Sequence, residues 1–286
     1  MATLREVKNR ISSVKNIKQV TRAMKMVAAA KLQKAQQSIE QARPYAYKIN
    51  NVLTQLLPQV DRSMNPLLEV REPEAIGLVI VTADRGLCGA FNSRIIRQAE
   101  KEIDKYNPDQ INLICIGKKG LNYFRRREYT IIGEYVDFFK ELDFTNATSI
   151  VDVIVDLYVS EGLDRVEVLY NEFKNVIQQD VVVEQFLPLV IQESEAQESI
   201  DEFLFEPSEE VIVDSLVPRH LNVQMWRMLL ESNAAEQAAR RTAMDNATSN
   251  AEEMIEDLQM QYNKARQAAI TKEISEIVGG AEAMSE

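Results

Sequence analysis

The chain has 286 residues, of which 45% are hydrophobic and 27% charged, and this is too apolar a composition for an intrinsically disordered protein. No stretch approaches the roughly 18 consecutive apolar residues of a membrane-spanning helix, and the N-terminus lacks the pattern of a secretory signal, so we expect a cytoplasmic protein. The net charge of -11 is unevenly spread: residues 1–58 carry eleven basic and two acidic side chains, whereas residues 192–286 carry seven basic and twenty acidic ones, so the two ends should attract each other.

A first long helix is predicted from about Thr3 to Leu57. Apolar residues recur there at spacings of three and four, with basic and glutamine residues on the other faces, and this is the periodicity of an amphipathic helix. The segment contains no glycine, which would destabilise a helix interior. Pro44 should kink the helix or begin a second stretch of it.

The middle of the chain predicts a different architecture, a Rossmann-like α/β domain over about Glu74–Val190. Short β-rich runs alternate with helical ones, and this alternation implies a mostly parallel sheet wrapped by helices. The expected strands are Ile76–Ala83, Ile111–Ile116, Val166–Tyr170 and Val181–Val190, and the expected helices are Asn92–Tyr106 and Ala147–Ser160. The acidic stretch Gln192–Glu206 should be a connector.

A second long helix is predicted from about Ser208 to Val278, with a heptad-like apolar seam. Pro207 suits its start and Pro218 should bend it. At about 1.5 Å per residue the two helices would be about 80 and 105 Å long, and neither is stable alone at that length. We therefore expect them to form one antiparallel coiled coil, the shaft, with the α/β domain at its base.

The predicted domains are residues 1–58, 74–192 and 207–286, the first and last being the two strands of the coiled coil. If Leu57 lies opposite Glu209, paired positions sum to about 266, so that Met24 faces the region of Thr242. Everything after about Asn263 would then project as a lone helix.

Several motifs could carry chemistry. The stretch Thr82–Asn92 (TADRGLCGAFN) lies between a strand and a helix, where α/β folds often bind phosphate, but it lacks both glycine-rich nucleotide fingerprints, so a structural or contact loop is favoured. The single histidine, His220, is expected at the surface and excludes a multi-histidine metal site or a histidine-based triad. Cys88 is expected to be a small packed residue, and the basic cluster Arg125–Arg127 a solvated helix end rather than a nucleic-acid site. No cofactor, metal or nucleic acid is predicted.

Three segments resemble the gamma subunit of bacterial ATP synthases. They are KQVTRAMKMVAAAKLQKA (Lys18–Ala35), TADRGLCGAFN and QYNKARQAAITKEISEIVGGA (Gln261–Ala281). Their order and spacing and the total length also agree with that family. The resemblance therefore covers essentially the whole chain.

The resemblance implies a central rotor shaft whose paired helices fill a ring of three alpha and three beta subunits, with the epsilon subunit and the membrane ring of c subunits as further partners. Ion flow through the c ring would drive rotation, and the catalytic sites would belong to the beta subunits. This chain would be non-catalytic. It would lie on the cytoplasmic face of the cell membrane as a peripheral protein, without inserting into it.

By motif match, the resemblance also implies contact residues. Those expected to contact the beta subunits and to couple rotation to catalysis are Met24, Lys25, Arg85, Cys88, Arg266, Gln267 and Thr271. An apolar tip, suited to a low-friction bearing, is formed by Ile274, Ile277, Val278 and Met284. The insertion of chloroplast gamma subunits is missing and no mitochondrial presequence is visible, so a bacterial source is favoured.

Other functions stay open. The chain could be a coiled-coil adaptor that links partners without transmitting torque, or an enzyme using the central α/β domain, and the basic face of the first helix could bind an acidic membrane surface. Nucleotide titration separates the enzyme from the others.

Overall fold

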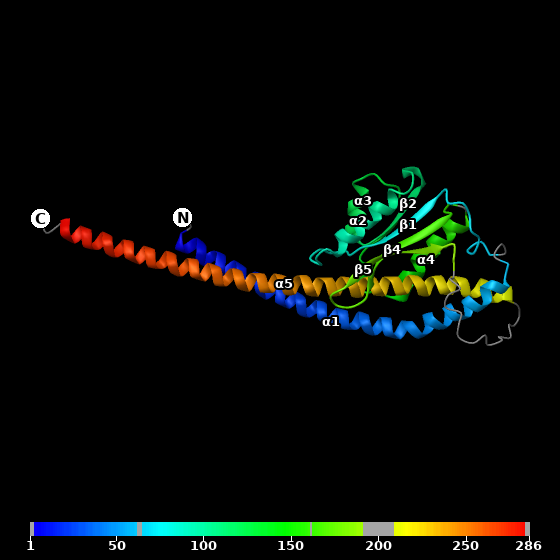
Figure 1. The fold of residues 1–286 in the computed structure, drawn as a ribbon, viewed down its shortest axis with the longest axis horizontal. Coiled ribbons are helices and arrows are strands. Elements are labelled where there is room, and N and C mark those ends of the chain that lie inside the picture. Colours follow the sequence, from blue (N-terminus) through cyan, green and yellow to red (C-terminus); the bar gives the residue numbers. More distant parts are fainter. Residues whose placement is uncertain (1–2, 62–64, 161, 191–208, 284–286) are drawn as a thin grey trace. The chain divides into compact units, whose positions relative to one another are not determined.

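The computed structural model describes residues 3–61, 65–160, 162–190 and 209–283, and these residues form two compact units (Figure 1). We call Ala29–Arg240 the sheet unit, and Met1–Ala28 together with Arg241–Glu286 the helical unit. The helices α1 (Leu4–Leu56) and α5 (Glu209–Ala283) each contribute to both units. The domain boundaries predicted from the sequence follow the ends of these helices instead, and that division of the chain stays a prediction. The predicted connector lies outside the described residues.

The two long helices are confirmed. The start of α1 and its end each lie within one residue of the predicted positions, and Pro44 lies inside a single helix. The start of α5 is one residue later than predicted, Pro218 lies inside it, and it continues five residues past Val278. Gly279 and Gly280 therefore do not end the helix.

The sheet has five strands in the order β3-β2-β1-β4-β5. The strands are β1 (Ile76–Val81), β2 (Ile111–Ile116), β3 (Ile131–Tyr135), β4 (Arg165–Phe173) and β5 (Gln179–Leu187). All neighbouring pairs are parallel except β4 with β5, which confirms the predicted mostly parallel sheet. Neither β3 nor the helix α3 (Lys118–Arg125) before it was predicted from the sequence; β3 is a half-buried edge strand of five residues whose apolar run is interrupted by Gly133 and Glu134.

Helices cover both faces of this sheet. On one face, α2 (Phe91–Ile103) and α3 pack their buried Ile95 and Phe124 among strand residues such as Leu78 and Leu113. The alternate strand residues, such as Val79, point to the other face, where α4 (Phe144–Val159) and α5 cover the sheet. Strand side chains alternate between faces with a period of two, so each buried strand supplies both layers of the core.

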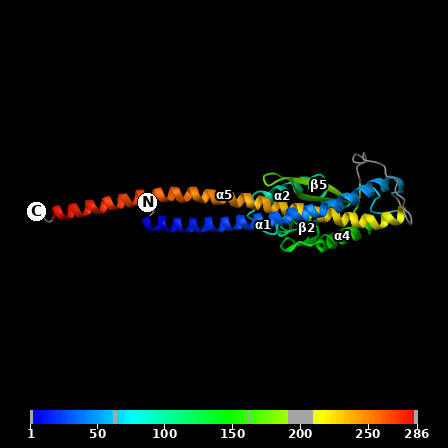
Figure 2. The same cartoon turned by 90° about the horizontal axis from the view of Figure 1, so that it is seen from below.

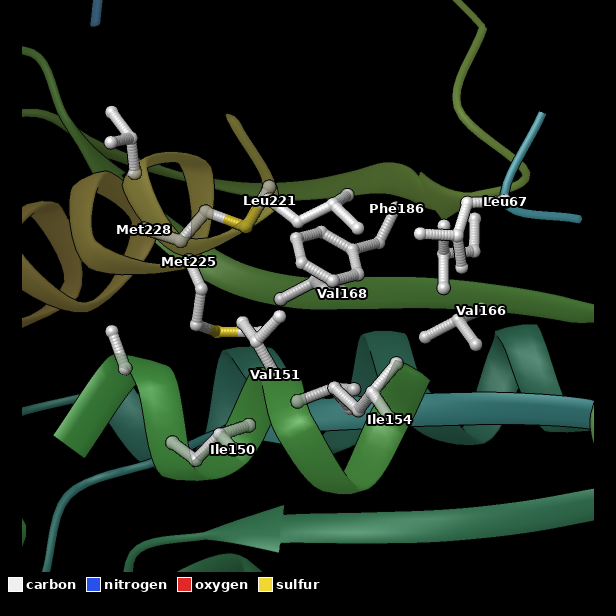
Figure 3. Close-up of a cluster of buried hydrophobic side chains, with 14 of the residues drawn as sticks. Leu67, Ile150, Val151, Ile154, Val166, Val168, Phe186, Leu221, Met225 and Met228 are labelled. Atoms are coloured by element: carbon white, nitrogen blue, oxygen red, sulfur yellow. The ribbon is translucent and has the colours of Figure 1, made fainter. Parts of the chain in front are cut away.

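The core layer between the sheet and α4 also includes side chains of the two long helices in the sheet unit. In Figure 3, Met225 of α5 reaches toward Val151 of α4, and Phe186 of β5 lies between Leu221 and Val168. Figure 2 shows the α1 and α5 segments of this unit running along the sheet. Leu53 and Leu56 of α1 are 0% exposed in the same cluster, and burying a leucine side chain stabilises a fold by about 1.5–3 kcal/mol.

In the helical unit, α1 and α5 pair in antiparallel fashion. Lys18 lies 2.8 Å from Glu252, and Lys25 lies 2.5 Å from Asp245. An apolar seam accompanies these pairs and contains Val7, Ile11, Val14, Ala251 and Leu258. The register differs from the predicted one by about a helical turn. Lys25 faces Asp245, whereas the prediction, in which Leu57 lies opposite Glu209 and Met24 faces the region of Thr242, puts Lys25 opposite Arg241.

Candidate functional site

The loop between β1 and α2, residues 82–90, is anchored at its start by Thr82. This side chain is fully buried, donates a hydrogen bond from Oγ1 to the carbonyl of Ile116 (3.0 Å), and accepts one from the backbone N–H of Gly120 (2.9 Å). A Cβ on Gly117, whose φ is +91°, would lie 2.0 Å from the Thr82 carbonyl oxygen. Glycine is therefore required there, and the close approach ties the loop to the start of α3.

Asp84 extends the same anchoring. Its Oδ1 accepts hydrogen bonds from the backbone N–H groups of Lys118 (3.1 Å) and Asp137 (3.0 Å). The N–H of Lys119 donates to the Ala83 carbonyl. The first amides of α3, which could hold a phosphate in other α/β proteins, thus have partners within the loop.

Side chains from three elements pack behind the loop. Cys88, Phe91 and Ala83 form a buried cluster with Ala235 of α5. This cluster lies at the carboxyl end of β1, where open α/β sheets commonly bind ligands. This packing, together with the paired first amides of α3, favours interpreting TADRGLCGAFN as a structural or contact loop.

Helix α5 holds the loop through a buried ion pair. Arg240 is paired with Glu236, one turn earlier, and their side chains are 12% and 7% exposed. The Arg240 Nη2 also donates a hydrogen bond to the Gly86 carbonyl (3.2 Å). Burial raises the pKa of Glu236, while Arg240 lowers it in part. The sequence analysis did not identify these residues, although their spacing of four on a helix is typical of an ion pair.

The loop presents Arg85 and Leu87 to solvent, whereas Cys88 faces inward. Arg85 is exposed, and Leu87 is 65% exposed. Cys88 is 2% exposed, as expected for a packed residue, and burial raises the pKa of its thiol. Its Sγ accepts a hydrogen bond from Asn92 Nδ2 at 3.2 Å. The Cys88 side chain does not reach the surface. If the loop contacts a partner, Cys88 therefore contributes by holding the loop in place.

Met24 and Lys25 lie on α1 in the helical unit, and both are half-buried. The Lys25 ion pair and a hydrogen bond between the hydroxyls of Thr248 and Thr21 (2.8 Å) fix this part of α1 against α5. Val20, Met26 and Val27 nearby are more than half exposed. The segment thus offers apolar surface beside a fixed helix pair.

The end of α5 carries the remaining predicted contact residues. Arg266, Gln267 and Thr271 are exposed, and so are Ile274, Ile277 and Val278, at 56%, 68% and 53%. Within the helical unit this end extends past the first turn of α1 (Figure 1), as the lone tip was predicted to do. At 1.5 Å per residue, Arg266 lies about 30 Å along α5 from the Asp245 that pairs with Lys25, so the structure does not bring these two groups together. Met284 lies outside the described residues.

The prediction for His220 was wrong. The side chain is 3% exposed, because the early part of α5 packs under the sheet rather than lying at the surface. Burial, and to a lesser extent Arg227, lowers the pKa of His220 to about 4, so it is neutral near pH 7. The basic cluster Arg125–Arg127 is exposed at the end of α3, as expected for a solvated helix end.

Neither a membrane span nor a metal site is found among the described residues. No helix there combines the length and hydrophobicity of a membrane span. No group of three or more His, Cys, Asp or Glu side chains in the same ranges is placed to hold a metal ion. The fold defines an α/β protein with paired terminal helices, and it exposes a firmly held loop in the sheet unit and a bare helix end in the helical unit.

Comparison with known proteins identifies the family. A profile of the family described as ATP synthase matches residues 3–284. The ATP synthase gamma chains of Chloroherpeton thalassium and Prosthecochloris aestuarii are each 49% identical to this chain, and the alignments cover 100% and 99% of it and 99% of each relative. The chain belongs to the ATP synthase gamma chain family.

Solved structures support the same assignment. A chain from the central stalk and c ring of the Tetrahymena thermophila mitochondrial ATP synthase is 28% identical, with a TM-score of 0.64, over 80% of this chain and 99% of that one. A chain from the Euglena gracilis mitochondrial ATP synthase is 20% identical, with a TM-score of 0.71, over 98% and 94%. The second likeness shows the fold alone.

Proposed function

We propose that this chain is the central rotor shaft of an ATP synthase and that it transmits torque between the ion-driven c ring and the catalytic beta subunits. The observation that carries the proposal is the antiparallel pairing of the two ends of a gamma-family chain in the helical unit, with an exposed apolar end on α5. Three alpha and three beta subunits surround the shaft, and the epsilon subunit and c ring bind the same chain.

The mechanism follows from symmetry. A single asymmetric shaft inside a ring of three identical catalytic subunits presents a different surface to each of them. Each surface favours a different conformation of the subunit it meets, because a contact shifts a conformational equilibrium by its differential affinity. Rotation then moves every beta subunit through the same series of states.

Within this proposal, the chain itself is non-catalytic. The single histidine is buried and neutral near pH 7, and the carboxyl end of β1 is filled by Cys88 and its neighbours. Synthesis and hydrolysis of ATP belong to the beta subunits. The chain acts as a peripheral protein on the cytoplasmic face of a bacterial cell membrane, in keeping with its bacterial relatives.

Two sets of contacts would couple rotation to catalysis. Met24 and Lys25 on α1, Arg85 on the loop supported by Cys88, and Arg266, Gln267 and Thr271 on α5 face the beta subunits. Ile274, Ile277, Val278 and Met284 form the bearing at the tip, where apolar side chains make no ion pairs that would oppose sliding. The exposure of Arg85 and of the described members on α5 supports these roles, and the half-buried Met24 and Lys25 lie beside the exposed Val20, Met26 and Val27.

Truncation after Ala265 tests the proposal. It removes the bare end of α5 and leaves the ion pairs between α1 and α5 in the helical unit, and the whole sheet unit. In the assembled complex we expect lower torque and less ion pumping per ATP hydrolysed, with unchanged Trp226 fluorescence as evidence that the sheet unit is folded. Normal torque and pumping would contradict the role of the tip. Failure of the full-length chain to co-purify with alpha and beta subunits would contradict the shaft itself.

A further inference from the structure

Leu87 combines two features that do not serve the chain's own fold. Its φ is +63°, in the left-handed region that favours glycine and costs free energy for a branched side chain. Its side chain is also 65% exposed, so the chain gains little from burying it. Strained residues that persist on a well-held loop are often involved in function.

The conformation of Leu87 is imposed by its neighbours. On one side, the Gly86 carbonyl accepts the hydrogen bond from Arg240. On the other, Cys88 is buried against Ala235 of α5. The leucine is thus presented to solvent between two fixed points, so little side-chain or loop ordering would oppose its binding to a partner.

The other two non-glycine residues with positive φ in the described chain have ordinary explanations. Glu128 (φ +61°) is an exposed residue just after the end of α3, where helices commonly adopt this conformation. The backbone N–H of Asp137 (φ +64°) donates to Asp84, and its carboxylate pairs with Lys118 and Lys140. Of these three residues with positive φ, Leu87 is the apolar one, and neither of these explanations applies to it.

The charge around Leu87 indicates the chemistry of its partner. Arg85 is exposed two residues earlier, and the exposed Lys119 lies close to the loop, with its Nζ 3.7 Å from the position that a Cβ on Gly86 would occupy. An apolar side chain flanked by two cations is complementary to an apolar recess with carboxylates at its rim.

We propose that Leu87 is an apolar anchor that inserts into such an acid-rimmed recess on a beta subunit. The inference rests on the proposed function and deepens it, because it names the side chain through which the loop binds. Hydrophobic anchors that fill a pocket dominate the affinity of many interfaces, whereas exposed charges around them contribute more to orientation and association rate.

Four variants in the reconstituted complex test the anchor. Leu87→Ala removes the side chain and keeps most of the backbone cost, and Leu87→Gly removes both. Leu87→Met keeps an apolar side chain of similar volume. Glu128→Gly is the matched control, because it relieves a positive φ at an exposed site away from the loop. The readouts are the denaturation midpoint of the free chain, the chain concentration that half-saturates reconstitution with alpha and beta subunits, and ion pumping per ATP hydrolysed.

We expect Leu87→Gly and Glu128→Gly both to raise the midpoint of the free chain. Leu87→Gly and Leu87→Ala should raise the half-saturating concentration about tenfold and reduce pumping per ATP. Leu87→Met should recover most of what Leu87→Ala loses, and Glu128→Gly should leave both readouts near the wild-type values. Unchanged assembly and pumping with Leu87→Gly would overturn the anchor and leave the shaft standing. A lower midpoint with Leu87→Gly would also overturn it, because the side chain would then serve the fold. If the wild-type chain supports no pumping, the proposed function itself fails.

Discussion

The same two helices are held in different ways in the two units. In the sheet unit, α1 and α5 contribute fully buried side chains such as Leu53 and Met225 to a core shared with the sheet. In the helical unit they contact each other along a narrow seam, and the ion pair of Lys18 with Glu252 is 34% and 51% exposed. One sequence pattern, apolar residues at helical spacing, thus supports a core in one place and a two-helix contact in the other.

The difference bears on function. Long helices are marginal without partners for their apolar stripes, and Val20, Met26 and Val27 of the helical unit still expose more than half of their surface. The helical unit therefore has apolar surface available for partner subunits. The sheet unit is the stable foundation on which the loop with Arg85 and Leu87 is held.

The largest effect should come from truncating the shared core. Met225 is 0% exposed, and we expect Met225→Ala to lower the free energy of unfolding of the sheet unit by about 3 kcal/mol, since it leaves a cavity. The measurement is chemical denaturation followed by the fluorescence of Trp226, the single tryptophan, which packs in the sheet unit.

Ile11→Ala in the helical seam is the matched comparison. Ile11 is 9% exposed and packs only along the two-helix seam, so the substitution should leave the Trp226 transition almost unchanged. Equal destabilisation by the two substitutions would show that the units unfold together, and the contrast drawn between them would be wrong.

A smaller effect is expected from Arg240→Met, which leaves Glu236 buried without its partner. We expect a loss of about 2 kcal/mol at pH 8, because an unpaired buried carboxylate is unfavourable. The loss should be smaller at pH 5, since the pKa of Glu236 is already raised by burial and the carboxyl group can take up a proton. Denaturation of the variant at both pH values checks this.

Arg241→Met provides the control, because it makes the same chemical change at a half-buried neighbour. A loss equal to that of Arg240→Met would indicate a general effect of charge removal rather than a broken buried pair. Restoration of stability by adding Glu236→Gln to Arg240→Met would support the pair.

The smallest expected effect is that of acidic pH on the stability of the helical unit. A hydrogen bond from Lys18 lowers the pKa of Glu252 below its usual 4.5, so the stability that this pair contributes is present above about pH 4.5 and is lost as the pH falls further. Burial raises the pKa of Glu231 and of Glu236 in the sheet unit, so their linkage has the opposite sign. Asp137, with its pKa lowered to about 2 by Lys118 and Lys140, keeps its pairs over the same range.

We therefore expect acidification from about pH 4.5 to about pH 3 to reduce helicity, measured by far-ultraviolet circular dichroism, before Trp226 fluorescence changes. Glu252→Gln should remove part of that early loss. Simultaneous changes in the two signals, in the wild type and the variant alike, would show that the helical unit is no more sensitive to acid than the sheet unit.

Much of this architecture follows from the sequence alone. Glycine-free flanks with apolar residues at spacings of three and four indicate α1 and α5, because glycine is unfavourable in helices and the spacing fits one helical face. Buried β-rich runs indicate β1 and β2 for the same local reasons. The three segments that resemble ATP synthase gamma subunits (Lys18–Ala35, Thr82–Asn92 and Gln261–Ala281) also identify the family. These signals are local, so they can be recognised without knowing what packs against them.

Tertiary structure alone decided the rest. His220 is buried, and Arg240 bonds the Gly86 carbonyl, through contacts with residues far away in the chain. No local sequence pattern specifies such contacts. The register of the helix pair is also set by which side chains meet, and it places Lys25 opposite Asp245 rather than a turn away. The positive φ of Leu87 is imposed by the fixed residues on either side, so its exposed position emerges only when the loop is folded against α5.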